Sequence, residues 1–444
     1  MPLIVSLMVI IITPFTAAVK YYICRQAKLK RQQFKDLIVI GVTGSYGKTS
    51  VKEFTAQILS RRFKVLKTEK NINTEIGIAR TILKKLTSEH QIFVCEIGAY
   101  KRGEIKKSGK IARPQIAVIT GINEQHLSLF GSLENIIAAK SEIILNLTPQ
   151  LIGGLNSEPS QAIKSLNSNK PLVFLNYDSE NIRQIKVPSS CQKITYGITN
   201  RDADVRAKFV DGQWFLSLNK EIGKLGNWEI GKLPDCQTGG GNWELEIGNL
   251  LGKHNVLNLL PAIAIAWQLG MNMGEIELAI KNIKPPAGTM QVYNIIRGAT
   301  KFILIDDTYN ANPAGVKAAL EVLSDYNGVG TQNIASLLKN KILILDDILE
   351  LGREALRIHQ EIGERIAKMN LAKVILIGKN YAGLLRKILL KAGFTSEQAI
   401  IYQPGMKIDD IIVGQKAIIL FEGRRAKQIL DLVLEIEHSR KFSE

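Results

Sequence analysis

The stretch that most constrains the fold is "GVTGSYGKTSVKEF", residues 41–54, a glycine-rich turn followed directly by Lys-Thr-Ser. The apolar run at residues 37–44 predicts a buried strand, and residues 48–62 carry apolar side chains at helical spacing. Gly44 and Gly47 let the backbone turn tightly and point N–H groups at oxygen atoms, and the helix adds its positive N-terminal end. This strand–turn–helix order predicts a loop that binds phosphate.

The side chains of this turn suit a nucleoside triphosphate. Lys48 can reach the terminal phosphates, and Thr49 can offer its hydroxyl to Mg²⁺. Ser45 and Ser50 are further candidate contacts of the nucleotide. The strict pattern G-x-x-x-x-G-K-[ST] requires glycine where Val42 stands, so the loop is a variant. We predict an ATP site here; the alternative is a tight turn that binds nothing.

Strands and helices alternate along most of the chain, which predicts an α/β fold with mostly parallel sheets and helices on both faces. Further buried strands are expected at residues 92–98, 116–122, 302–307, 341–347, 373–378 and 416–423. The linker "IKPPAGTMQV" separates a central P-loop-type ATPase domain, residues 36–288, from a Rossmann-like, doubly wound C-terminal domain, residues 289–444. Within the central domain, about residues 190–250 predict a small β-hairpin region.

The N-terminus has a different composition. Residues 3–19, "LIVSLMVIIITPFTAAV", carry no charge and are about long enough to cross a bilayer. Basic residues follow as far as Lys35, which places that side in the cytosol. We predict that residues 1–35 form one transmembrane helix and a basic juxtamembrane segment, with the catalytic domains on the cytosolic side of the cytoplasmic membrane. A buried N-terminal helix is the alternative.

Charge and cysteine usage narrow the range of partners. The chain has 58 Lys+Arg against 41 Asp+Glu, formally +17, which suits a nucleotide, a nucleic acid or an acidic lipid. It has no basic patch interleaved with aromatic residues, so we expect no nucleic-acid partner. The four cysteines form no C-x-x-C pair, which argues against a zinc or redox motif and fits a reducing, cytosolic setting.

Three more residues are candidates for the chemistry of the phosphate. Glu96 ends a predicted strand, where a carboxylate beside a phosphate loop would be a ligand of Mg²⁺. His126 follows the third strand, and Lys140 lies in "AAKSEI". Each also has an ordinary interpretation, as a capping carboxylate, a structural histidine and a solvated helix lysine.

Seven stretches of the chain, taken in order, resemble the Mur ligase family. They are "TGSYGKTSVKEF", "NINTEIG", "CEIGAYKRGEI", "INEQHLSLFGSLENIIAAKSEI", "GKHNVLNLLPAIAIA", "IDDTYNANPAGVKAAL" and "LDDILELG". The resemblance covers roughly residues 37–435 and is greatest to the branch that joins D-alanyl-D-alanine to a UDP-N-acetylmuramoyl-tripeptide. It implies ATP-dependent amide-bond formation through an acyl phosphate in peptidoglycan precursor synthesis, and hence a role in cell shape and division.

The resemblance also implies roles for the candidate residues. Lys48 and Thr49 would contact the ATP phosphates and Mg²⁺, and Glu96 would share that metal ion. His126 and Lys140 match positions that serve a second Mg²⁺, so two ions are expected. Lysine is often carbamylated at the second position, which turns an amine into a carboxylate-like ligand.

Further positions would contact the nucleotide. Asn255 and Asn258 match the stretch that approaches the adenine, and Asp307 matches an acidic residue near the ribose. Weaker candidates near the phosphates are Asn71, Asn73 and Glu75. His359 matches a position of the C-terminal domain to which the resemblance assigns no role.

The beginning of the chain departs from the family pattern. The family normally opens with a domain that grips the UDP-sugar, but only about 36 residues precede the first central strand here. We expect that a membrane anchor replaces this domain, and that a partner chain supplies UDP-sugar recognition. Two alternative functions follow: a Mur-type ligase for a different, lipid-linked carboxylate, and a non-catalytic, membrane-tethered nucleotide-binding scaffold.

Overall fold

A computed structural model describes residues 2–69, 72–149, 170–210, 213–218, 242–245, 247, 250–297, 300–326, 340–406 and 416–441. It divides the chain into two compact units, which are described separately. The first unit comprises Met1–Ile122, Ser132–Glu246 and Leu257–Asn282, and the second comprises Asn123–Gly131, Ile247–Val256 and Ile283–Glu444.

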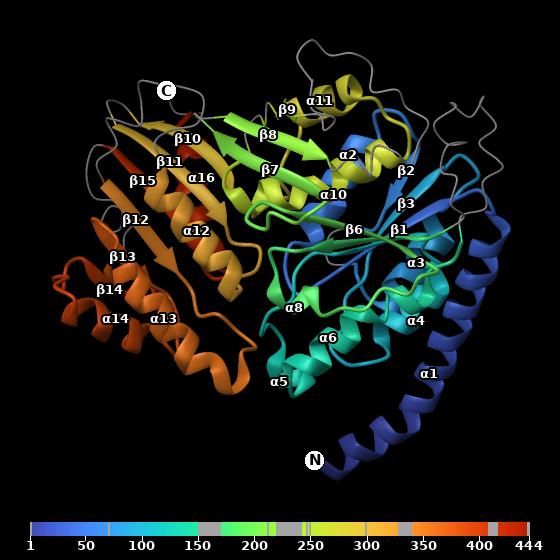
Figure 1. The fold of residues 1–444 in the computed structure, drawn as a ribbon. Helices are drawn as coiled ribbons and strands as arrows, with labels where there is room; N and C mark the ends of the chain where they lie inside the picture. The colour runs from blue at the N-terminus through green and yellow to red at the C-terminus, as the bar shows by residue number, and fades with distance from the viewer. Residues whose placement is uncertain are drawn as a thin grey trace. The chain divides into compact units, whose positions relative to one another are not determined.

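The first unit is built on a sheet whose described strands follow the order β2-β3-β1-β4-β5-β6-β7-β8-β9 (Figure 1). The strands are β1 (Ile38–Thr43), β2 (Val65–Lys67), β3 (Ile92–Glu96), β4 (Ile116–Ile119), β5 (Leu172–Asn176), β6 (Gln192–Gly197), β7 (Val205–Val210), β8 (Gln213–Leu218) and β9 (Asn242–Leu245). Strands β2 to β7 pair in parallel, and β7, β8 and β9 pair antiparallel. The predicted hairpin region thus includes β6 to β9, and its residues 219–241 lie outside the described part.

Helices cover both faces of this sheet, which explains why β1, β3 and β4 are almost continuously apolar. In Figure 1, α2, α10 and α11 lie on one face, and α3, α4 and α6 lie on the other. The helices are α1 (Pro2–Gln33), α2 (Lys48–Leu59), α3 (Glu75–Lys85), α4 (Glu104–Ala112), α6 (Leu133–Ser141), η1 (Ile144–Asn146), α8 (Glu180–Arg183), α10 (Lys253–Gln268) and α11 (Met273–Lys281).

The second unit has a sheet of order β10-β11-β15-β12-β13-β14, parallel except for the pair β10 and β11. Its strands are β10 (Gln291–Arg297), β11 (Thr300–Asp307), β12 (Asn340–Leu345), β13 (Lys373–Leu376), β14 (Ala399–Ile401) and β15 (Lys416–Glu422). Its helices are α5 (Leu127–Phe130), α12 (Pro313–Asp325), η3 (Gly352–Glu354), α13 (Ala355–Ala367), α14 (Ala382–Lys391) and α16 (Ala426–Lys441). Residues of α12, α13 and α14 pack with strand residues in one hydrophobic core, and residues of α16 pack with strand residues in a second core. The predicted α/β class with parallel sheets is confirmed.

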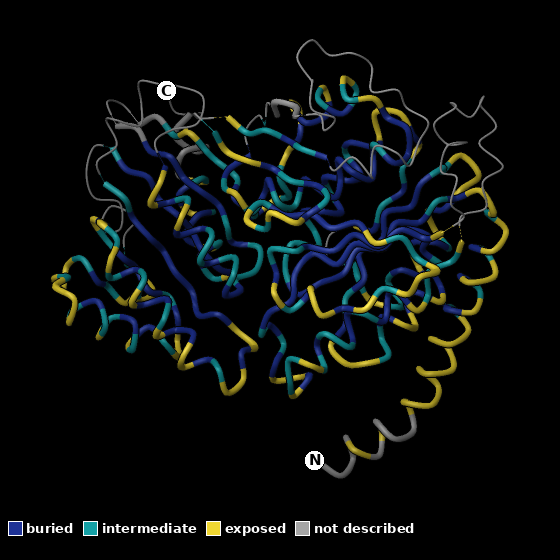
Figure 2. Tube along the Cα trace, viewed as in Figure 1, coloured by how far each residue is buried: buried dark blue, intermediate teal, exposed yellow. Residues whose placement is uncertain are grey.

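Helix α1 corrects the expectation for the N-terminus. Its C-terminal half packs against α3 and α4, with Cys24 and Ala27 buried, while its described N-terminal residues are exposed (Figure 2). Arg31 is buried and donates hydrogen bonds to the carbonyl oxygens of Ala112, Phe34 and Leu37 at 3.1, 2.7 and 3.0 Å. The segment predicted to be juxtamembrane is therefore a helix docked on the first unit.

Within the described residues, the structure contains no helix with the length and apolar character that a membrane crossing requires. The side chains of residues 2–5, 7 and 9–11 lie outside the described part. This finding contradicts the predicted transmembrane anchor and the predicted location at the cytoplasmic membrane. The basic residues that were expected to lie beside a membrane have partners within the protein instead. Lys20 pairs with Glu75 at 2.8 Å, and Arg31 donates a hydrogen bond to the carbonyl oxygen of Ala112.

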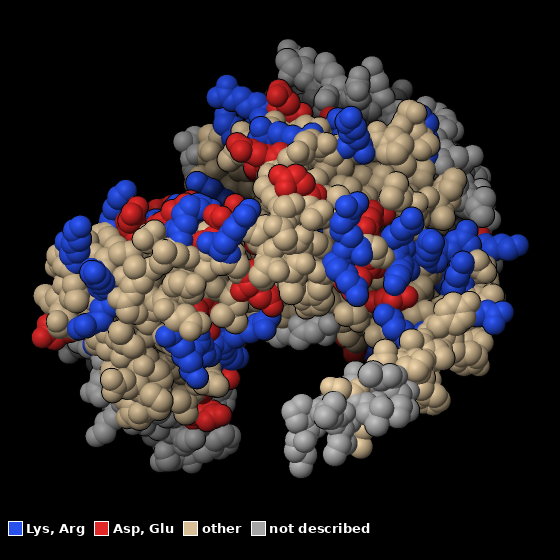
Figure 3. Space-filling model, turned by 90° about the horizontal axis from the view of Figure 1, so that it is seen from below, with Lys and Arg blue, Asp and Glu red and all other residues tan. Residues whose placement is uncertain are grey.

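The basic side chains are spread out on the face of the protein that Figure 3 shows. On the face shown in Figure 3, lysine and arginine side chains lie in separate groups with aspartate and glutamate side chains among them. Several basic residues have acidic partners, such as Arg365 with Glu321 at 2.8 Å in the second unit.

Candidate active site

The glycine-rich turn connects β1 to α2 in the first unit. Gly47 is the N-cap residue of α2 with φ 76°, a left-handed conformation that favours glycine. A Cβ atom on Gly47 would also lie 2.6 Å from Oδ1 of Asn258, so the position lacks space for a side chain. The backbone N–H of Ser45 donates a 2.6 Å hydrogen bond to the Gly121 carbonyl, which ties the turn to the end of β4. The turn thus leads directly into the N-terminus of a helix, where N–H groups can bind an anion.

Lys48 folds back over this loop. Its Nζ donates hydrogen bonds to the carbonyl oxygens of Gly44 and Ser45 at 2.9 and 2.8 Å. Burial lowers the pKa of Lys48, and the carboxylate of Glu96 opposes that shift. The ammonium group therefore stands at the loop, close enough to Glu96 for their charges to interact.

Glu96, the last residue of β3, is the centre of a polar cluster. Its Oε2 accepts a 3.0 Å hydrogen bond from the Thr49 hydroxyl, and its Oε1 accepts a 3.1 Å bond from Nδ2 of Asn73. The fully buried Nζ of Lys52 lies 3.6 Å from Glu96 Oε2 and 3.3 Å from Oε1 of Glu53. The structure therefore brings the predicted residues Thr49, Asn73 and Glu96 together.

The sequence motifs did not predict Lys52 as part of this cluster. The available signal was helical spacing, because residues four apart lie on the same face of a helix and Lys52 follows Lys48 by one turn. A fully buried ammonium needs a carboxylate partner. Lys52 therefore stabilises the charge of Glu96 from within the core.

Lys140 lies on α6 and is buried, with 1% of its surface exposed. Burial and, to a smaller extent, the positive charge of Lys48 lower the pKa of Lys140 to about 7, against the opposing effect of Glu104 and Glu142. The carboxylate of Glu142 accepts hydrogen bonds from the N–H groups of Gly103 and Lys106, at 2.6 and 3.0 Å, where α4 begins. Lys140 is therefore a buried amine within the electrostatic reach of Lys48, and not the solvated helix lysine of the ordinary interpretation.

His126 belongs to the second unit, where its Nδ1 lies 2.5 Å from Oε2 of Glu350. Both residues have left-handed backbones, with φ 66° for His126 and 65° for Glu350. Such conformations are uncommon for residues other than glycine and persist only where the surroundings hold them. Glu350 was not predicted as a site residue, although it lies within the motif "LDDILELG".

The remaining candidates are divided between the units. Asn258 faces Gly47 in the first unit, whereas Asn255 is buried and donates a 2.8 Å hydrogen bond to the Leu251 carbonyl in the second. Asp307 ends β11 in the second unit. The weaker candidate Asn71 lies outside the described residues.

Asp307 has a carboxylate neighbour that the sequence did not indicate. Glu422 stands opposite Asp307 in the pairing of β11 and β15. Burial raises the pKa of Asp307 to about 7, and burial together with the charge of Asp307 raises the pKa of Glu422 well above its ordinary value. Two facing carboxyl groups in this environment share a proton near neutral pH.

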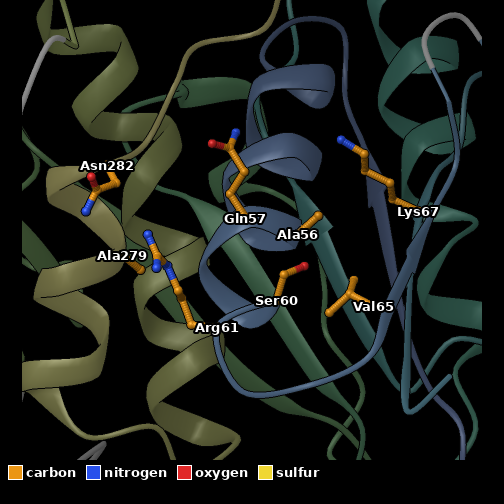
Figure 4. Close-up of a pocket in the computed structure, with 8 residues that line it drawn as sticks. All are labelled: Ala56, Gln57, Ser60, Arg61, Val65, Lys67, Ala279 and Asn282. Atoms are coloured by element: carbon orange, nitrogen blue, oxygen red, sulfur yellow. The ribbon is translucent and has the colours of Figure 1, made fainter. Parts of the chain in front are cut away.

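A pocket of about 280 Å³ lies in the first unit, at the end of α2 remote from the glycine-rich turn (Figure 4). Its lining comprises Ala56, Gln57, Ser60, Arg61, Val65, Lys67, Ala279 and Asn282. None of the predicted site residues lines it. The pocket is therefore separate from the polar cluster around Glu96.

In the described part of the chain, no group of three or more His, Cys, Asp or Glu side chains is placed to hold a metal ion by itself. The Glu96 carboxylate and Thr49 hydroxyl are nevertheless oxygen donors of the kind that Mg²⁺ takes in combination with substrate phosphates. Together they fit a Mg²⁺ ion that arrives with a nucleotide.

Comparison with known families identifies the family of the chain. The pattern of the Mur ligase middle domain matches residues 42–266, more than half of the chain. The chain belongs to the Mur ligase family. The match includes the glycine-rich turn, Glu96 and Lys140, so the cluster described above lies within the matched domain.

Curated Mur ligases from distant bacteria align over most of the chain. The UDP-N-acetylmuramoyl-tripeptide–D-alanyl-D-alanine ligase of Escherichia coli strain K12 is 28% identical over 402 residues, covering 90% of this chain and 77% of the relative. The ligase of the same name from Bacillus subtilis strain 168 is 30% identical over 344 residues, covering 77% of this chain and 63% of the relative.

Solved structures agree with this assignment. A crystal structure of MurF from Acinetobacter baumannii has a TM-score of 0.70 at 25% identity, covering 94% of this chain and 80% of that one. MurF ligase from Thermotoga maritima, solved in complex with ADP, has a TM-score of 0.68 at 22% identity and covers 95% of this chain and 84% of that one. The likeness to the second structure concerns the fold alone.

Proposed function

We propose that this Mur ligase joins D-alanyl-D-alanine to the carboxylate of UDP-N-acetylmuramoyl-tripeptide, with hydrolysis of ATP to ADP and phosphate. The names of its relatives supply the substrates. The observation that carries the proposal is the cluster of Lys48, Thr49 and Glu96 beside a phosphate loop, in a chain that aligns with those relatives over most of its length.

The reaction has two steps. A carboxylate oxygen of the tripeptide attacks the γ-phosphorus of ATP, and ADP leaves, which yields an acyl phosphate. The amine of D-alanyl-D-alanine then attacks the acyl carbon, loses a proton, and expels inorganic phosphate. The loop N–H groups and the Lys48 ammonium stabilise the negative charge that develops during phosphoryl transfer.

Thr49 and Glu96 are the proposed ligands of Mg²⁺, which would neutralise phosphate charge when bound. The hydrogen bond between them, at 3.0 Å, already holds the two oxygen donors side by side. Asn73 and Lys52 hold the carboxylate from its other sides. These neighbours supply the outer contacts that orient a metal-binding carboxylate.

We further propose that Lys140 is carbamylated and, with His126, serves a second Mg²⁺. Only the neutral amine of a lysine reacts with CO₂, and a pKa of about 7 leaves about half of this amine neutral at pH 7. The carbamate would bring two anionic oxygens into a buried position next to the charge of Lys48. A ¹³C-carbamate resonance after incubation with ¹³C-bicarbonate, absent in Lys140→Ala, tests this modification.

For the nucleotide, we propose that Gly44, Ser45, Gly47 and Ser50 contact the phosphates, that Asn255 and Asn258 approach the adenine, and that Asp307 lies near the ribose. The contact of Asn258 with the Gly47 position supports its place beside the loop. The facing carboxyl groups of Asp307 and Glu422 support a role for Asp307 as a hydrogen-bonding partner of hydroxyl groups.

Phosphate release by the purified protein tests the proposal. The assay contains ATP, Mg²⁺, UDP-N-acetylmuramoyl-tripeptide and D-alanyl-D-alanine, and each component is omitted in turn. We expect release that requires all four components and disappears in Lys48→Ala. Release that is unchanged without the dipeptide, or with the tripeptide omitted, would overturn the substrate assignment.

A further inference from the structure

We propose that His359 is a positioning residue, which holds residues 348–352 in the conformation that directs Glu350 to His126. These residues, the 348–352 loop, follow β12 and lead into η3 in the second unit. The inference rests on the proposed function only in the role it gives to His126. The contacts that support it all lie within the second unit.

The two ring nitrogens of His359 have different backbone partners. Its Nε2 accepts a 3.1 Å hydrogen bond from the N–H of Ile348, and its Nδ1 lies 2.7 Å from the carbonyl oxygen of Ala355. An amide N–H can only donate and a carbonyl oxygen can only accept, so the proton must be on Nδ1. The structure thus defines one neutral tautomer, in which Nε2 is an acceptor.

Packing holds the ring in this orientation. His359 is 1% exposed, and its ring stacks on that of Tyr381 with centroids 3.9 Å apart and an interplanar angle of 12°. The N–H groups of Asn380 and Tyr381 donate to the carboxylate of Asp347 at 2.9 and 3.2 Å. Tyr381 is therefore tied to the residue that precedes the loop. Burial lowers the pKa of His359, which keeps the ring neutral and its acceptor available.

The loop that begins at Ile348 needs such an anchor. Glu350 has φ 65° and Gly352 has φ 56°, two left-handed residues within a short segment. The left-handed conformation is unfavourable for a residue such as Glu350, so other contacts must hold it. At the far end of the loop, Gly352 packs on the segment that carries His126, since a Cβ there would lie 3.3 Å from the Ser128 backbone.

Contacts at both ends of the 348–352 loop therefore hold Glu350 in place. The His359–Ile348 bond holds the beginning, the contact with Ser128 holds the end, and the Glu350 carboxylate lies 2.5 Å from Nδ1 of His126. Loss of the His359 acceptor would free Ile348, relax the strained backbone of Glu350 and leave His126 without its oriented partner. A partner that orients a metal-binding histidine affects metal affinity more than fold stability.

Two conservative variants separate the functions of the two ring nitrogens. In His359→Gln the amide oxygen reaches the position of Nε2 and can still accept from Ile348. In His359→Asn the shorter amide reaches only the position of Nδ1, so the bond to Ala355 remains and the bond to Ile348 is lost. Both variants remove the stacked ring, so they are matched in their effect on packing.

The measurements are the Mg²⁺ concentration for half-maximal phosphate release, and hydrogen–deuterium exchange of the 348–352 loop. We expect His359→Asn to raise the half-saturating Mg²⁺ concentration about tenfold, as for other partners that orient metal ligands, and to speed exchange in the loop. His359→Gln should stay near wild type in both. Equal behaviour of the two variants would overturn the proposal.

A double variant tests the path through Glu350. If His359 acts through Glu350, adding His359→Asn to Glu350→Gln should cause little further change in Mg²⁺ dependence, because the two effects are not additive. Fully additive effects would contradict that path. If the wild-type protein has no ligase activity, the proposed function is refuted but the role of His359 is not. The exchange measurement still tests whether His359 holds the 348–352 loop.

Discussion

The hydroxyl of Thr49 donates a 3.0 Å hydrogen bond to Oε2 of Glu96 and so joins the first turn of α2 to the last residue of β3. This bond crosses the carboxyl edge of a parallel sheet, the edge at which α/β proteins bind their ligands. It brings two oxygen donors next to the glycine-rich turn and places the buried ammonium of Lys52 close to the Glu96 carboxylate.

Replacing Glu96 with glutamine should lower both activity and stability. The variant leaves the buried ammonium of Lys52 without one of its two carboxylates, and breaking a buried ion pair costs about 3–5 kcal/mol. We expect activity to fall by roughly 100-fold or more, as when a charge-stabilising group is removed. Urea unfolding and phosphate release measure the two effects. In the double variant Glu96→Gln with Lys52→Met, stability should recover and activity should not. A double variant whose stability does not recover would contradict the buried-pair account.

Gly47→Ala should abolish nucleotide binding, because the new Cβ requires a strained backbone and approaches Oδ1 of Asn258. Gly103 is the matched control, since its φ is 87° and nothing lies within 4 Å of a Cβ there. Both variants carry the backbone penalty of about 1–2 kcal/mol, but only the first disturbs the loop. Titration with a fluorescent ATP analogue should show loss of affinity in Gly47→Ala alone. Equal loss in both would assign the effect to general destabilisation.

Lys140 should make stability depend on pH in CO₂-free buffer. Its pKa is about 7 in the folded protein, against 10.5 as the ordinary value in the unfolded chain. Between these values unfolding takes up a proton, so the free energy of unfolding rises as pH rises from about 7 to 10. Lys140→Met should flatten this slope by up to about 1.4 kcal/mol per pH unit. The exposed Lys110→Met serves as control; an unchanged slope in Lys140→Met would show that the amine is not neutral when buried.

The facing carboxyl groups of Asp307 and Glu422 should give the opposite pH dependence. The folded pKa of Asp307 is raised to about 7 from 3.8, so its contribution to stability is complete below about pH 4 and is lost as pH rises through 7. Glu422→Gln removes the repulsion and should stabilise the protein at pH 8 more than at pH 5. Urea unfolding at both pH values measures this, with the exposed Glu321→Gln as control. An equal effect at the two values would refute proton sharing.

Arg31→Met should loosen α1 from the first unit. Its guanidinium donates to three backbone carbonyl oxygens, and these acceptors would lose their charged partner. We expect a loss of about 2–3 kcal/mol in the free energy of unfolding, typical of charge-assisted bonds in a buried setting. Lys28→Met, at an exposed position of the same helix, should cost less than about 0.5 kcal/mol. Similar stability of both variants would mean that the docking of α1 contributes little.

The sequence by itself determined much of the local structure. The apolar run before the glycine-rich turn forms β1, the amphipathic residues after it form α2, and the strands predicted at 92–98 and 341–347 appear as β3 and β12. These features depend on hydrophobic periodicity and turn chemistry, which act between near neighbours in the chain. The glycine-rich turn between β1 and α2 was identifiable for the same reason, and its binding of phosphate stays a prediction.

Other relationships depended on tertiary structure. The strand order placed Asp307 opposite Glu422, and the packing of the 348–352 loop placed Glu350 beside His126, although each pair is far apart in sequence. The N-terminal segment shows the same limit, because its apolar and basic pattern suited a membrane anchor as well as a docked helix. Only the burial of Cys24, Ala27 and Arg31 showed that the C-terminal half of this segment is a docked helix. Local patterns specify helices, strands and turns, whereas pairs of distant residues meet only when the whole chain buries its apolar surface.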